Sequence, residues 1–255
     1  MRDGAGGDVC GPLHSIEDMP ATSVPPDRSA PLADATWPEV DGARPGVAVP
    51  VGSVEQHGPH LPLDTDTRIA TAVAERLPGL VAAPAIAYGA SGEHEGFAGT
   101  VSIGSDTLRS VIVEYGRSAC RWAPRVLFVN GHGGNAPALA EAVALLRYEG
   151  RDAAWLPCAV PGGDAHAGRT ETSLLLHLSP GDVRSDRLEC GNVRPISALM
   201  PELRSGGVAS VSANGVLGDP TGASAEEGAR VFEQMCARAA DAVHRWAADD
   251  RGMLR

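Results

Sequence analysis

The sequence predicts an α/β fold: one domain in which a mostly parallel sheet carries helices on both faces. Short apolar runs that suit buried strands alternate along the chain with amphipathic helical patterns, and this alternation is typical of parallel sheets. No internal repeat divides the chain. With 255 residues, 43% of them hydrophobic, it is long enough to build a single domain with a sizeable core.

Apolar runs without polar alternation give the strand candidates, because strands of a parallel sheet are buried on both faces. The first is the Val-rich run 46–51, and the clearest is R-V-L-F-V-N at 125–130. Two shorter candidates cover 80–83 and 152–156.

Apolar residues at helical spacing predict the helices. These are expected at 67–77, at 106–122, from Asn135 onward, at 170–178, and from Ser224 to about 248. Ser224 opens a capping-box pattern. Residues 179–219 show no regular pattern and are expected to be irregular.

The domain is expected to span residues 37–255, because residues 1–36 are rich in Gly, Pro, Asp and Ser and read as a flexible N-terminal extension. The start of the chain lacks the pattern of a signal peptide, and no apolar run reaches the roughly 18 residues of a membrane span.

The five cysteines are widely spaced, which favours a reducing cytoplasm over a disulfide framework. A net charge of -11 argues against nucleic acid or a membrane surface as a partner.

The stretch that follows the first strand candidate is rich in metal-type ligands. Glu55 and His57 are two residues apart, so in an extended segment both side chains can point to one side. Asp66 lies just before a helical pattern and can swing back towards them. Carboxylate and imidazole groups are ligands that divalent transition metals prefer. On its own, such a short motif is more often a polar loop that faces water.

Two other segments bring the same kinds of side chain to the same place. His132 follows the run 125–130, and His166 and Glu171 follow the run 152–156. In open α/β sheets ligands bind at the carboxyl ends of the strands, so these segments are expected to meet there. The resulting set suits two divalent ions that share a carboxylate, and its members are Glu55, His57, Asp66, His132 and Glu171. Ligand chemistry does not separate zinc, iron(II) and manganese(II).

Such a pair of ions indicates hydrolysis of an amide, because it can acidify water and polarise a carbonyl group. His166, in a glycine-rich loop, is the candidate donor of a proton to the leaving nitrogen. The N–H groups around Gly133, Gly134 and Asn135, at a helix N-terminus, are expected to bind a substrate carboxylate or an oxyanion.

The remaining polar residues of these loops have less certain partners. His94 is a candidate substrate-binding residue, although at most one or two of residues 93–95 can line a pocket, and a surface loop is the alternative. His60 and Asp64 are expected to support the ligands from behind. No G-K-[ST] follows the glycines at 131–134, and G-x-S-x-G is absent, which excludes a phosphate-binding loop and a serine hydrolase of the α/β type.

Four phrases together resemble the creatininase family of amidohydrolases, over a match that runs from about residue 47 to the last helix. They are G-S-V-E-Q-H-G-P-H-L-P-L-D-T-D, E-H-E-G-F-A-G-T-V-S, N-G-H-G-G-N and H-A-G-R-T-E-T-S. The resemblance implies an α/β metallohydrolase domain with a two-metal site and, usually, a homo-hexamer. Glu55, His57, Asp66 and His132 match family ligands, with Asp66 as the bridge, and His166 matches the proton-transfer histidine.

The sequence departs from the creatinine-hydrolysing members at two places. Gly134 stands where those members carry a ligand glutamate, so Glu171 is expected to supply the missing carboxylate. The loop before His166 reads P-G-G-D and lacks the tryptophan of those members. Creatinine is therefore not the expected substrate.

Within the family, D-T-D-T-R-I-A-T-A-V-A and Y-G-A-S-G-E-H-E-G-F most resemble the branch that works in the mycofactocin system. This resemblance implies a peptidase that releases the C-terminal dipeptide derived from Val-Tyr from a modified precursor peptide. The alternatives are an amidohydrolase that acts on creatinine or a formamide, and a metal-binding subunit without activity.

Overall fold

The computed structural model describes residues 30–255, so most of the expected N-terminal extension lies outside the described part. Its centre is a four-stranded sheet in the order β2-β1-β3-β4, and every neighbouring pair is parallel. The strands are β1 (Gly46–Val51), β2 (Leu80–Ala82), β3 (Val126–Asn130) and β4 (Ala153–Pro157). The predicted fold class is confirmed.

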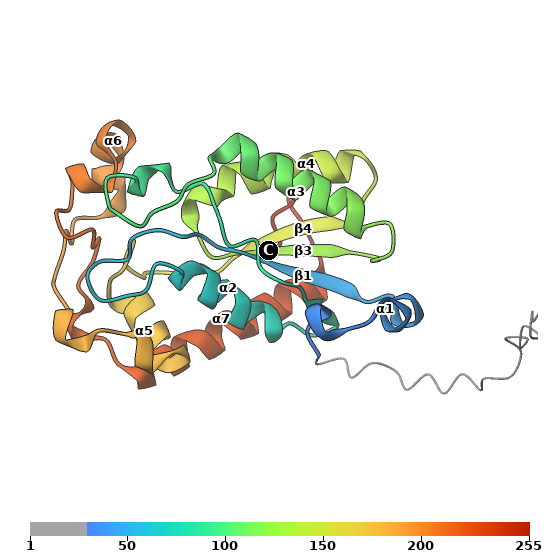
Figure 1. Cartoon of the computed structure of the whole chain (residues 1–255), viewed down its shortest axis with the longest axis horizontal. Coiled ribbons are helices and arrows are strands. Elements are labelled where there is room, and N and C mark those ends of the chain that lie inside the picture. The colour runs from blue at the N-terminus through green and yellow to red at the C-terminus, as the bar shows by residue number, and fades with distance from the viewer. Residues whose placement is uncertain (1–29) are drawn as a thin grey trace, which may run out of the picture.

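Helices cover both faces of this sheet (Figure 1). On one face lie α3 and α4, and on the other lie α2, α5 and α7. The helices are α1 (Trp37–Ala43), α2 (Thr65–Glu75), α3 (Ser105–Ala119), α4 (Ala136–Tyr148), α5 (Arg169–Leu178), α6 (Ile196–Gly206) and α7 (Ala225–Arg245). Among the described residues, no helix is long and apolar enough to cross a membrane.

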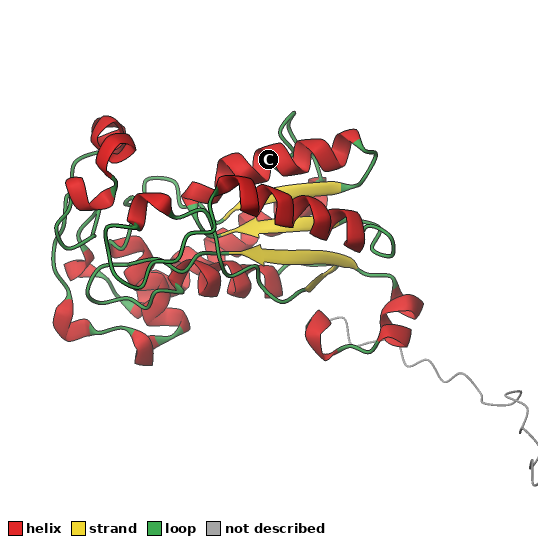
Figure 2. Cartoon of the chain, turned by 45° about the horizontal axis from the view of Figure 1, so that its top comes forward, coloured by secondary structure: helices red, strands yellow, loops and turns green. Residues whose placement is uncertain are grey.

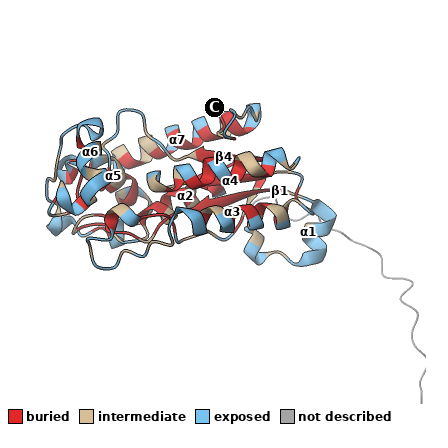
Figure 3. Ribbon diagram, turned by 90° about the horizontal axis from the view of Figure 1, so that it is seen from above, coloured by how far each residue is buried: buried red, intermediate tan, exposed pale blue. Residues whose placement is uncertain are grey.

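The strand β3 explains why the strand candidates read as unbroken apolar runs. Val126 and Phe128 belong to the core under α3 and α4, whereas Leu127 and Val129 belong to the core under α2, α5 and α7. Successive side chains of a strand point to opposite faces, so a strand covered on both sides needs apolar residues at every position. Figure 3 shows the resulting buried layer between the helices.

The register of the sheet brings the ends of three strands together. Val51 of β1 pairs with Asn130 of β3, and Asn130 pairs in turn with Pro157 of β4. The loops that follow these strands therefore leave the sheet side by side, at the end that carries the arrowheads in Figure 2. The candidate site residues lie in these loops.

The structure differs from the prediction in the segment 179–219, which was expected to be irregular. It contains the helix α6, with Pro201 inside it. Its apolar residues follow helical spacing over only two turns, and Leu199 is its one buried residue. Proline usually breaks a helix, so Pro201 within so short a pattern hid α6 from the sequence.

Candidate metal centre

Two glycines allow the start of α2 to enter between the ends of β1 and β3. A Cβ atom on Gly52 would lie 2.1 Å from Oγ1 of Thr67, and one on Gly131 would lie 2.3 Å from the carbonyl oxygen of Asp66. Both distances are far below van der Waals contact, so any side chain at either position would push α2 away. The close approach leaves Asp66 2% exposed at the centre of the site.

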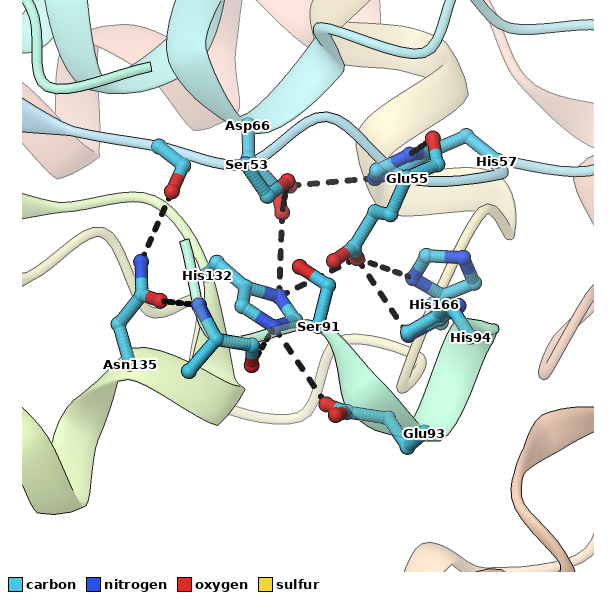
Figure 4. Close-up of polar contacts among 12 residues, drawn as sticks. Ser53, Glu55, His57, Asp66, Ser91, Glu93, His94, His132, Asn135 and His166 are labelled. Carbon is cyan, nitrogen blue, oxygen red and sulfur yellow. Dashed lines mark hydrogen bonds and ion pairs between the residues drawn. The ribbon is translucent and has the colours of Figure 1, made fainter. Parts of the chain in front are cut away.

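Asp66 presents its two carboxylate oxygens to two different histidines (Figure 4). Oδ1 lies 3.1 Å from Nε2 of His57, and Oδ2 lies 3.2 Å from Nδ1 of His132. The hydroxyl of Ser53 donates a hydrogen bond of 2.8 Å to Oδ2. A carboxylate placed in this way between two imidazoles has the geometry of a bridging ligand.

Glu55 completes a first group of ligand atoms. It is fully buried, and Oε1 lies 3.2 Å from Nδ1 of His132. Neither carboxylate oxygen has a hydrogen-bond partner among residues 30–255. Burying a carboxylate without hydrogen bonds is costly, so a charge of this kind is expected to face a cation. Ligand atoms about 2.0–2.2 Å from one ion lie roughly 3.0–3.5 Å apart, and the distances of 3.2 Å from Nδ1 of His132 to Glu55 and to Asp66 fall in this range.

A second group lies around His57. Nε2 of His57 faces Oδ1 of Asp66 and lies 3.9 Å from Oε2 of Glu171. His57, His166 and Glu171 each offer a ligand atom within 4.8 Å of the others, as do Glu55, His57 and Asp66. Six of the predicted residues, with His132 and His166 included, thus come from three loops and the start of two helices into one cluster that could hold metal.

The outer nitrogen of each metal-facing histidine is held by the protein. Nδ1 of His57 lies 3.2 Å from the carbonyl oxygen of Glu55. Nε2 of His132 lies 3.2 Å from the carbonyl oxygen of Ala90 and 3.4 Å from Oε1 of Glu93. An N–H group at these outer positions leaves the inner nitrogen unprotonated and free to bind a metal, which is the usual arrangement of metal-binding histidines.

Gly134, where the sequence lacks the glutamate expected from the resemblance, is closely surrounded. A Cβ atom on Gly134 would lie 2.4 Å from Nε2 of His132 and 2.7 Å from Oε1 of Glu93. The space that a side chain at position 134 would need is thus filled by His132 and by the Glu93 carboxylate. Glu171, and not a residue at position 134, brings a carboxylate next to His57.

The histidines His94 and His166 are joined by Gln56, which the sequence did not single out. Nε2 of His166 donates to the carbonyl oxygen of Gln56 at 2.8 Å. The Gln56 amide group can then donate to Nδ1 of His94 at 2.9 Å and to the carbonyl oxygen of Gly215 at 3.0 Å. Satisfying every donor in this way leaves Nδ1 of His166 facing Glu55, 3.8 Å from Oε1. His94 reaches the same oxygen with Nε2 at 3.4 Å.

The carboxylates create a negative potential that favours cations. Burial lowers the pKa of His57, but the charge of Asp66 and its hydrogen bond outweigh burial and raise the pKa to about 10. Burial also raises the pKa of Glu171 to about 7. In contrast, burial and the charge of His57 hold the pKa of His166 well below its ordinary value. The raised pKa values of His57 and Glu171 mean that protons bind where the carboxylates lie close together. A divalent ion bound there would relieve the same repulsion between carboxylates and would displace these protons.

Of the two residues expected behind the ligands, the structure brings only one to the cluster. His60 is fully buried, and its Nε2 lies 2.9 Å from the hydroxyl of Thr172, next to Glu171. The side chain of Asp64 is 46% exposed and pairs with Arg68 at 2.8 Å.

Asn135, predicted to bind substrate, is fully buried. Its amide nitrogen donates to the carbonyl oxygen of Gly52 at 2.9 Å, and its amide oxygen accepts from the backbone of Ala90 at 2.8 Å. The side chain therefore ties the loops after β1 and β3 to the loop that precedes His94.

A cavity of about 850 Å³ opens above the cluster. His132, His166 and Glu171 line it on the side of the sheet, together with the backbone of Gly133 and Gly134. Its other side is formed by residues of α6, including Ile196, Met200, Leu203 and Arg204.

Comparison with known proteins agrees with the site. The family model described as "Creatininase: Creatinine amidohydrolase" matches residues 33–243, and the chain belongs to the creatininase family. The family predicted from the sequence is confirmed.

Among individual relatives, the chain is 60% identical over 232 residues to a protein of Mycolicibacterium smegmatis named "Mycofactocin precursor peptide peptidase", covering 88% of this chain and 94% of the relative. The protein of that name from Mycobacterium tuberculosis is 58% identical over 236 residues, with the same coverage of both chains. The creatinine amidohydrolase of Pseudomonas putida is 29% identical over 254 residues, covering 85% of this chain and 96% of that protein. A solved structure described as "Creatininase Mn" superimposes with a TM-score of 0.70 at 28% identity, covering 84% of this chain and 97% of the other.

Proposed function

We propose that this protein is a metal-dependent peptidase that releases the C-terminal dipeptide derived from Val-Tyr from a modified mycofactocin precursor peptide. The observation that carries the hydrolytic part is Asp66, whose two oxygens face His57 and His132 separately. The choice of substrate is supported by the relatives of 58% and 60% identity that bear the name of such a peptidase.

We assign the first divalent ion to Glu55, Asp66 and His132, and the second to His57, Asp66 and Glu171. The unpartnered oxygens of Glu55 and the inward nitrogens of both histidines support this assignment. Zinc, iron(II) and manganese(II) all suit this donor set. When bound, the ions supply Lewis acidity that polarises the scissile carbonyl and acidifies water.

The residues of the chain then handle the proton. Hydrolysis adds a water oxygen to the carbonyl carbon and breaks the C–N bond, and the departing nitrogen must gain a proton. Nε2 of His166 is anchored on the carbonyl oxygen of Gln56, so Nδ1 is the atom that takes a proton from water and passes it to nitrogen.

The backbone next to His132 leaves room for the scissile carbonyl group of the substrate. A Cβ atom placed on Gly133 would meet nothing within 4 Å, and Gly133 and Gly134 both line the cavity, so a substrate can approach the backbone at this end of α4. Donors at a helix N-terminus can hold the oxygen on which negative charge develops. We assign to His94 contact with the substrate, and to Asn135 the positioning of these loops.

The size of the cavity favours a peptide over a small ring. A volume of about 850 Å³ lies in the range of roughly 300–1,000 Å³ that is typical of sites for drug-sized ligands. Creatinine would leave most of this space to water.

Two further features complete the proposal. The family resemblance supports a homo-hexamer, which light scattering on the purified protein would measure. Free thiols at Cys120, Cys158, Cys190 and Cys236 fit the reducing cytoplasm.

The test is to incubate the metal-loaded protein with modified precursor peptide and to follow both products by mass spectrometry. The expected result is a shortened peptide and the dipeptide derivative in equal amounts. Creatinine and formamide serve as parallel substrates. Absence of cleavage by a protein that carries two ions per chain, or turnover of creatinine in its place, would contradict the assignment.

A further inference from the structure

Helix α6 carries an apolar stripe that the core uses only in part. Ile196, Leu199, Met200 and Leu203 fall at spacings of three and four residues, and so lie along one side of the helix. Leu199 is fully buried and forms a small core with Val208 and Leu217. Ile196 remains 43% exposed, and both it and Met200 line the cavity above the metal cluster.

The position of α6 is fixed relative to the cluster. Gly207, directly after α6, has a φ of +67°, and a Cβ atom there would lie 2.6 Å from the carbonyl oxygen of Glu93. A Cβ atom on Gly96 would lie 2.8 Å from the side chain of Ala209. The end of α6 is thus packed directly on the loop that carries Glu93 and His94, and the helix forms a defined wall of the cavity.

The two walls of the cavity differ in chemistry. The wall at the sheet carries His132, His166 and Glu171, whereas the first two turns of α6 offer Ile196, Met200 and Leu203, and only the last turn adds polar side chains. A substrate whose scissile bond lies over the metal cluster must place neighbouring groups against α6. Thioether and branched aliphatic side chains attract apolar and aromatic groups and offer nothing to a charged or strongly polar one.

We propose that Ile196 and Met200 are specificity-determining residues, which bind the apolar side chains of the C-terminal segment of the peptide substrate. This rests on the proposed peptidase function. The new element is that α6 selects the peptide, and that it does so through apolar contact and not through the metal cluster.

The experiment measures binding separately from cleavage. His166→Gln serves as the background, because it removes the proton-transfer group, and calorimetry gives the Kd of the metal-loaded protein for two synthetic peptides. One peptide ends in Val-Tyr, and the other is identical but ends in Ser-Ser. The background protein is expected to prefer the Val-Tyr peptide by about tenfold or more, which corresponds to burial of one apolar side chain.

Substitutions on α6 then test where the preference resides. Met200→Glu and Ile196→Glu are expected to bring the ratio of the two Kd values close to one, and Met200→Leu to keep it. Val193→Glu is the matched control, because Val193 precedes α6, is 66% exposed and is not among the residues that line the cavity. It should keep the full ratio, and metal content should be equal in all variants.

Three results would overturn the inference. The first is a background protein that binds both peptides equally, and the second is a preference that survives both glutamate substitutions. The third is a change in oligomeric state with Met200→Glu, measured by light scattering, which would assign the stripe to a subunit interface. Cleavage by the unmodified enzyme is a separate measurement, so failure of the peptidase function would appear there and leave the binding ratio interpretable.

Discussion

The metal cluster and helix α6 form opposite walls of one cavity, and they are built in opposite ways. In the cluster, charged groups such as Glu55 and Asp66 are almost fully buried and held by close backbone approach. In α6, apolar side chains such as that of Ile196 are exposed to the cavity. From this contrast we expect substitutions in the cluster to affect metal binding and turnover, and substitutions of the exposed side chains of α6 to affect the choice of substrate.

The largest effect is expected at Asp66, to which we assign a place at both metal positions. Asp66→Ala should lose both ions and reduce turnover by about 10⁴-fold or more, because each oxygen serves one position. Metal analysis by mass spectrometry, beside the rate of peptide cleavage, measures both. A variant that keeps two ions per chain would refute the bridging role.

A smaller effect is expected at His166, to which we assign proton transfer and not metal binding. His166→Gln should reduce kcat by roughly 10²–10⁴-fold, the usual contribution of a positioned acid or base, and should leave metal content unchanged. Loss of metal in this variant would instead make His166 a ligand, which its proximity to His57 and Glu171 also permits.

Adjacent glycines provide a comparison of crowding within the cluster. Gly134→Ala should weaken metal affinity by about 10–100-fold, because its Cβ would displace His132 from Glu93. Gly133→Ala, whose Cβ would meet nothing within 4 Å, should bind metal as the wild type does. Titration with zinc in the presence of a competing chelator measures both, and equal affinities would contradict the close packing around Gly134.

The smallest effect concerns stability. Removing metal with a chelator should lower the free energy of unfolding by about 2.7 kcal/mol for each ion that was present at 100 times its Kd. At about 2–4 °C per kcal/mol for a chain of this size, the Tm should fall by roughly 5–11 °C per ion. Re-addition of metal should restore the Tm. The same experiment on Met200→Glu should give the same shift, because α6 does not bind the ions. An unchanged Tm on chelation would argue against a metal that is bound in the folded state.

The buried sheet was predictable from the sequence because its strands have to be apolar at every position. The bounds of β1 agree with the prediction to the residue, and β3 and β4 agree within one. Helix α6 was not predictable, because its apolar stripe is shared between a small core and the cavity and is interrupted by Pro201.

The cluster itself was predictable for a related reason. Ligand-type residues that follow parallel strands must meet at the same sheet edge, so the positions of Glu55, His132 and Glu171 in the sequence are enough to bring them together. The direction of individual side chains was harder to predict from the sequence. Gln56 lies between two candidate ligands and would point away from them in a regular strand. Its contacts with His94 and His166 depend on the irregular backbone of the loop.

The central claim is that Asp66 bridges two divalent ions, and diffraction from metal-loaded crystals at the absorption edge of the bound metal tests it most directly. Two anomalous peaks are expected. One should lie between Glu55, Asp66 and His132, and the other between His57, Asp66 and Glu171. A single peak, or two peaks that do not share Asp66, would contradict the account.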